Sequence, residues 1–119
     1  MLRYAIASIV LSLAACDAPG EGRNFERARY EAEAVMTAMS RYRADEGRYP
    51  QRLDALSPRY LPQAFFEADR PGRAATHFDV RNVDAGGYDL AFGYNGPGIN
   101  YCEYIRETAP PRWDCSGHY

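Results

Sequence analysis

The apolar residues between Asn24 and Gly47 recur at spacings of three and four. They are Phe25, Ala28, Ala32, Val35, Met39 and Tyr42. Such spacing gathers them into one stripe on an α-helix. Asn24 is a favourable N-cap, and Gly47 is typical of the position after a last helical turn. The pattern predicts an amphipathic helix whose stripe packs on a sheet, with a coiled-coil seam or an oligomer contact as the alternative.

From Ala75 onward the hydrophobic period changes to two, which is typical of strands. The alternating apolar residues are Phe78, Val80, Tyr88, Leu90, Phe92 and Tyr94. Turn-forming residues separate the runs at 84–87, 95–98 and 108–111. This pattern predicts four strands joined by hairpins in an antiparallel meander, the last two covering 99–106 and 112–119.

The segment between the helix and the sheet is rich in proline, which confines any helix there to a turn or two. Leu53 and Leu56 share one face of such a turn, and residues 63–74 look irregular. Together the patterns predict an α+β fold in which one long N-terminal helix packs on a four-stranded antiparallel sheet.

The first 15 residues have the composition of an export signal. Arg3 precedes a short apolar run, and the small residues Ala14 and Ala15 follow it. Tyr4 to Ala15 spans 12 residues, whereas a membrane-spanning helix needs about 20. The closing Leu13-Ala14-Ala15-Cys16 resembles the lipobox of bacterial lipoproteins. That resemblance implies that residues 1–15 are removed and that Cys16 carries the acyl chains.

The position after the lipobox bears on the choice of membrane. Asp17 resembles the inner-membrane retention signal of enteric lipoproteins, so the inner membrane is favoured over the outer. Residues 16–24 contain Pro19, Gly20 and Gly22 without apolar periodicity, and we expect them to form a flexible tether. Residues 25–119 then form the single folded domain.

Charge and cysteine content narrow the class of protein. The 104 residues after the signal carry 13 arginines, no lysine and 16 acidic residues, a formal charge of −3. An exported acidic chain is an unsuitable partner for nucleic acid. Lipid on Cys16 leaves Cys102 and Cys115 to form a disulfide, which the oxidising space outside the cytoplasm permits.

A second resemblance covers residues 25–62. Tyr42, the run Asp45-Glu46-Gly47-Arg48-Tyr49-Pro50, and then Leu53 and Leu56 resemble a segment of the pseudopilin and type IV pilin-like family. In that family a long helix leads into such a segment and packs on an antiparallel sheet. The resemblance implies a pilin-like fold and a protein partner in a secretion or pilus-type apparatus. The hydrophobic half-helix that builds filaments in that family is missing from this chain.

The numbering of the last hairpin predicts its faces. Pairing Cys102 with Cys115 places Tyr104 opposite Trp113. We expect Tyr94 to lie opposite Ile99, and this register assigns the strand residues to two faces. The core face then includes Ile99, Tyr101 and Ile105, while Cys102, Tyr104, Trp113 and Cys115 lie on the uncovered face. Tyr104 and Trp113 there form an aromatic patch that binds proteins or sugars, or simply shields the disulfide.

The same register turns Asp114, Ser116 and His118 towards the core, which requires a bulge or an overhanging strand. Alternate strand residues lie roughly 6.5–7 Å apart, too far for a catalytic relay, which needs about 2.6–3.2 Å. His77 has no partner at metal-ligand spacing.

Calcium binding in the sheet, known in pseudopilins, has Asp79, Asp84 and Asp89 as its nearest candidates here. Turn and strand-surface roles explain these aspartates better.

These patterns predict a protein without catalytic residues, metal, cofactor or small-molecule substrate. The sequence indicates a lipid-anchored, periplasm-facing envelope lipoprotein that acts as a binding or assembly module. The alternative is an envelope lipoprotein that contacts peptidoglycan glycan through exposed aromatic residues.

Overall fold

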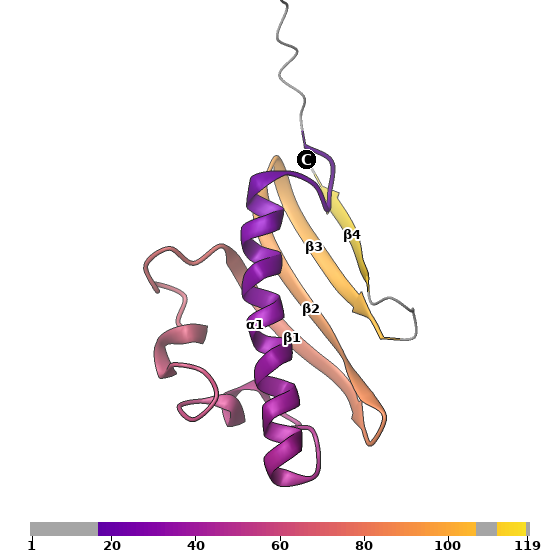
Figure 1. Ribbon diagram of the computed structural model, residues 1–119. Helices are drawn as coiled ribbons and strands as arrows, with labels where there is room; N and C mark the ends of the chain where they lie inside the picture. Colours follow the sequence, from indigo (N-terminus) through magenta and orange to yellow (C-terminus); the bar gives the residue numbers. More distant parts are fainter. Residues whose placement is uncertain (1–16, 107–111, 119) are drawn as a thin grey trace, which may run out of the picture.

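A computed structural model describes residues 17–106 and 112–118 and confirms the α+β class (Figure 1). One long helix, α1 (Gly22–Glu46), precedes two 3-10 helices, η1 (Leu53–Leu56) and η2 (Gln63–Phe66). The strands are β1 (Ala75–Asp84), β2 (Gly87–Gly96), β3 (Gly98–Ile105) and β4 (Arg112–His118). They form one antiparallel sheet in the order β1-β2-β3-β4, as the hairpin pattern predicts.

The predicted stripe of α1 is the face that packs on the sheet. Of the predicted residues Tyr42 is only half-buried, and Ala38 joins the face; the buried residues of α1 are Phe25, Ala28, Ala32, Val35, Ala38 and Met39. Gly47 ends the helix in the left-handed conformation and donates its N–H to the carbonyl of Arg43 at 2.8 Å. The predicted N-cap is wrong: Glu21 holds that position and Asn24 lies inside α1. A turn closed by the Glu21 N–H on the Ala18 carbonyl, 3.0 Å away, directly precedes the helix.

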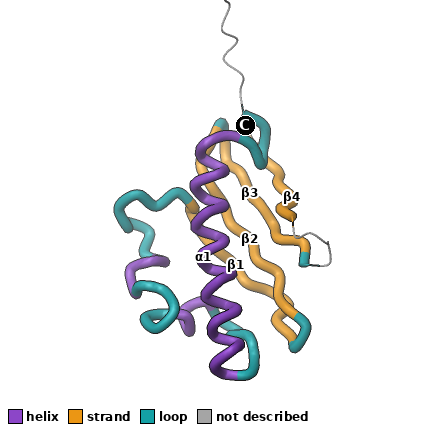
Figure 2. The backbone as a smooth tube through the Cα atoms, in the orientation of Figure 1, coloured by secondary structure: helices purple, strands orange, loops and turns teal. Residues whose placement is uncertain are grey.

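The core lies between α1 and the sheet. Its largest fully buried side chains are Phe92, Met39, Leu56, Leu90, Val35 and Cys102. The connection from Gly47 to Ala74, with η1 and η2, lies beside α1 on the side away from β3 and β4 (Figure 2). Leu56 closes the core from this connection. The inner face of β3 and β4 extends beyond α1 on the other side.

The predicted register between β2 and β3 is wrong by one residue. Asn95, and not Tyr94, pairs with Ile99, and Cys102 consequently pairs with Phe92. The pairing continues to Gly96 and Gly98, which leaves Pro97 alone between the strands, and Gly98 adopts a φ of 78° at this tight turn. A slip of one residue exchanges the two faces of a strand.

The corrected register moves β3 and β4 residues to the opposite faces. Ile99 is 74% exposed, whereas Asn100 is 3% exposed and faces the core. The prediction that Ile99, Tyr101 and Ile105 lie on the core face is therefore wrong. Asp114 and Ser116 lie on the outer face, where their polarity costs nothing.

The segment before α1 is packed on the sheet. The Gly20 N–H donates to the Tyr94 hydroxyl at 2.9 Å. A Cβ placed on Gly20 would lie 3.2 Å from the Cys115 sulfur, so the backbone runs directly over the disulfide. The prediction of a tether through residue 24 is wrong for residues 22–24, which belong to α1. Cys16 and the predicted signal at 1–15 lie outside the described residues. Within residues 17–106 and 112–118, no helix is long and apolar enough to cross a membrane.

Candidate binding surfaces

The predicted disulfide between Cys102 and Cys115 is confirmed. Tyr104 lies opposite Trp113 in the next pair along the same face, as expected. That face, however, is the inner one. The Trp113 ring meets Phe92 edge-on with 4.9 Å between ring centroids, and both Tyr104 and Trp113 are half-buried against the core. The prediction that the two rings lie on the uncovered face is wrong, because the β2–β3 register is shifted.

Trp113 therefore extends the core beyond α1. Glycan contact through Tyr104 and Trp113 remains a prediction. It was based on exposure of both rings on the uncovered face, and they lie half-buried on the inner face instead.

Replacing Trp113 with alanine should destabilise the domain by about 2 kcal/mol, less than the 3–5 kcal/mol of a fully buried aromatic residue. Tyr30→Ala is the matched control, because Tyr30 is 75% exposed and its loss should change stability by about 0.5 kcal/mol or less. Urea unfolding followed by circular dichroism measures both. Unchanged stability of the Trp113 variant, with lost retention on peptidoglycan, would restore the glycan hypothesis.

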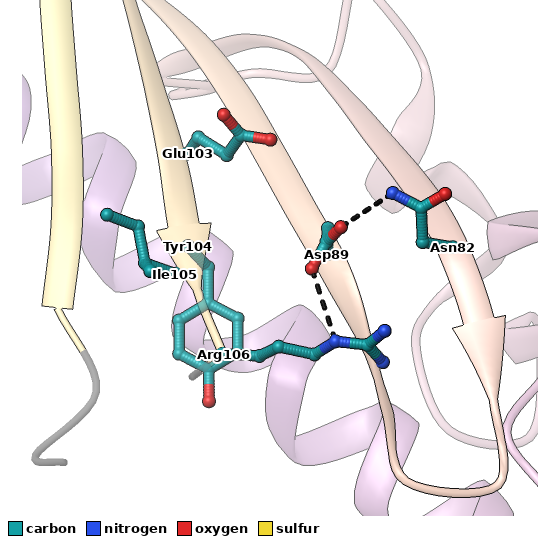
Figure 3. Close-up of a pocket in the computed structure, with 6 residues that line it drawn as sticks. All are labelled: Asn82, Asp89, Glu103, Tyr104, Ile105 and Arg106. Carbon is teal, nitrogen blue, oxygen red and sulfur yellow. Dashed lines mark hydrogen bonds and ion pairs between the residues drawn. The ribbon is translucent and has the colours of Figure 1, made fainter. Parts of the chain in front are cut away.

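The outer-face aspartates have basic partners. A hollow of about 410 Å³ contains Asp89, which lies between Asn82 at 2.7 Å and Arg106 at 3.5 Å (Figure 3). Asp84 pairs with Arg106 at 3.0 Å. The hydrogen bond from Arg106, followed by that from the Gly86 N–H, lowers the pKa of Asp84 below its usual value.

The third of these aspartates is also paired, since Asp79 lies 2.6 Å from Arg81. Arg106 joins the end of β3 to the β1–β2 turn, so this cluster has a structural role. Across the described ranges, no three His, Cys, Asp or Glu side chains gather as metal ligands.

His77 lies exposed on the outer face and stacks on Tyr101, with ring centroids 6.3 Å apart. The imidazole crosses the strand between them because Gly93 has no side chain there. The contact is between side chains of two different strands, β1 and β3, and depends on how these strands are arranged in the sheet. The sequence alone therefore did not indicate it.

A groove runs along α1 on the side of the connection. Two hollows of about 540 Å³ and 420 Å³ adjoin at Tyr30 and Ala34. Phe65 lines the first, and Tyr60 and Leu61 line the second. We call this surface the α1 groove. It places an exposed tyrosine between two apolar recesses.

A nearly buried ion pair fixes the far wall of the α1 groove. Glu31 and Arg70 lie 2.6 Å apart with side chains 12% and 22% exposed, respectively. Glu31 also accepts the Ala74 N–H at 2.7 Å. Arg70 donates to the Phe65 carbonyl at 3.0 Å and lies over its ring, 5.0 Å from the centroid. These polar contacts hold the connection, which forms this wall of the groove, against α1.

The rim of the α1 groove carries unpaired positive charge. Arg23 and Arg41 are exposed and form no ion pair within the described part of the chain. Glu26 and Glu33 are both engaged by Arg29. An apolar recess with arginines at its edge suits an apolar side chain carried on an acidic segment.

Comparison of the chain with models of known families, with curated proteins and with solved structures finds no match. The lipobox and the pilin-like resemblance therefore remain predictions from the residues that carry them.

Proposed function

We propose that the protein is a non-catalytic lipoprotein of the bacterial envelope that binds a protein partner through the α1 groove. The groove carries this proposal: Tyr30, 75% exposed, stands between two apolar recesses whose wall is fixed by Glu31 and Arg70. Exposed aromatic residues beside a preformed recess are typical of protein-binding surfaces.

The anchor is supported by the cysteines. The disulfide uses Cys102 and Cys115 and leaves Cys16, the last residue of the lipobox, as the third cysteine. A disulfide also suits an oxidising compartment. We propose that acylated Cys16 holds the domain on the periplasmic side of the inner membrane.

The proposed partner is a polypeptide that presents an apolar side chain next to carboxylates. Such a segment would fill a recess and face Arg23 and Arg41 at the rim. From the pilin-like resemblance we propose a component of a secretion or pilus-type apparatus as this partner.

Tyr30→Asp should weaken partner binding about thirtyfold, because truncating a central interface aromatic costs about 2 kcal/mol. Ser40→Asp is the matched control, since Ser40 is exposed on α1 and does not line the α1 groove. Co-purification from detergent-solubilised membranes measures both variants. Equal recovery of the partner with both variants would contradict a role for the groove.

A further inference from the structure

We infer that the end of the domain that carries the β2–β3 turn lies against the bilayer, with Ile99 inserted into the lipid interface. This inference rests on the proposed anchor at Cys16. It adds an orientation and a second contact with the membrane, at a residue to which no role has so far been assigned.

The chain leaves the domain at a fixed point. Asp17 is one peptide bond after Cys16, and consecutive Cα atoms lie about 3.8 Å apart. Pro19 packs at Gly117, where an added Cβ would lie 2.9 Å from the proline Cγ. Gly20 is held by Tyr94 and runs over Cys115. Because so little slack remains between the anchor and these contacts, the anchored domain cannot turn freely.

The two ends of the domain are clearly distinguished. The start of α1, the β2–β3 turn and the end of β4 lie together near the packed segment (Figure 1). The opposite end carries Gly47 and the β1–β2 turn, where Arg43 donates to the Ala85 carbonyl at 3.3 Å. The 25 residues of α1 separate the ends by about 37 Å. An anchor at the near end holds the far end well away from the lipid.

The near end has the chemistry of an interfacial contact. Ile99 is 74% exposed, although the register places its neighbours Asn100 and Tyr94 in the core. The turn Asn95-Gly96-Pro97-Gly98 carries no charge. The exposed charges nearby, Asp17, Glu21 and Arg23, belong to the segment at the start of α1 and not to this turn. Apolar side chains at such surfaces enter about 5–10 Å into the boundary between headgroups and acyl chains.

The test uses the processed, lipidated protein in phosphatidylcholine vesicles, with and without bromine on the acyl chains. Ile99→Trp and Ala85→Trp are compared in a Trp113→Phe background, so that each protein has one indole. We expect brominated lipid to quench most of the emission of the Ile99→Trp protein and to leave the Ala85→Trp protein unchanged. Equal quenching of the two, or stronger quenching at position 85, would overturn the orientation.

A measurement on the unaltered protein guards against misfolding of these variants. Hydrogen exchange of the wild-type chain on vesicles should show slower exchange at residues 95–99 than in the soluble Cys16→Ala protein, with residues 84–87 unchanged. No difference at 95–99 would overturn the inference. The mass of the Cys16 peptide shows whether lipid is attached and so separates the two proposals. If lipid is attached but residues 95–99 are not protected from exchange, only the orientation is contradicted. If no lipid is attached, the anchor is contradicted as well.

Discussion

Replacing Cys16 with alanine should abolish lipid labelling and release the domain from the membrane fraction. Each methylene of an acyl chain contributes about 0.8 kcal/mol to membrane binding, so the several chains of a lipoprotein provide nearly all of its retention. Ile99 at the proposed interface adds too little to hold the protein without them. Metabolic labelling with a clickable fatty acid, followed by fractionation of the cells, measures the effect.

The control for this variant is the double replacement of Cys102 and Cys115 with alanine. It removes both sulfur atoms of the disulfide but leaves the lipobox, so labelling should persist. Label that remains on the Cys16→Ala protein, or retention of that protein by the membrane, would contradict the lipoprotein assignment and move the search for an anchor elsewhere.

Glu31→Gln should destabilise the domain by about 3 kcal/mol, which is the cost of leaving a nearly buried charge without its partner. Arg70 would keep its position beside Phe65 but lose the carboxylate 2.6 Å away. The Ala74 N–H would lose a charged acceptor at the same time. Urea unfolding monitored by circular dichroism measures the loss, and partner binding should fall with it because the α1 groove loses its fixed wall.

Glu33→Gln is the matched control on the same helix. Glu33 pairs with Arg29 at the surface, with its side chain 49% exposed, and such pairs contribute about 0.5 kcal/mol or less. Similar small losses in both variants would mean that the contact between Glu31 and Arg70 does not fix the groove. A large loss in stability without any effect on the partner would separate folding from binding.

Much of the fold could be predicted because its signals are periodic. The stripe from Phe25 to Met39 identifies both the helix and its packed face. Alternation from Tyr88 to Tyr94 identifies the central strand, and its inner residues are buried as expected. The pairing of Cys102 with Cys115 fixes the last hairpin, because one cross-strand pair determines all the others in a regular ladder.

The register of the preceding hairpin could not be derived in the same way. Gly96 and Gly98 both tolerate left-handed backbone, so pairing of Ile99 with Asn95 and pairing of Ile99 with Tyr94 fit the same sequence. The polar residues Asp114, Ser116 and His118, predicted to face the core, were the sign that the pairing of Ile99 with Tyr94 was wrong. Moving Ile99 to the surface removes that conflict and exposes the apolar residue on which the membrane orientation depends.

The α1 groove was not predicted because its parts are far apart in the chain. Glu31 and Arg70 are 39 positions apart and meet only when the proline-rich connection folds back along α1. One signal was present in the sequence: Tyr30 is an aromatic residue outside the apolar stripe of the helix. Periodicity identifies the face that packs on the sheet, but it cannot show what lies beside the other face.

The most direct measurement is photo-crosslinking in cells from a reactive amino acid at position 30 of the lipidated protein, with position 40 as the control, followed by mass spectrometry of the purified complex. We expect one envelope protein, crosslinked from position 30 and not from position 40, to be recovered in near-stoichiometric amount. Recovery of the lipoprotein alone, or equal crosslinking from both positions, would contradict a binding module that acts through the α1 groove.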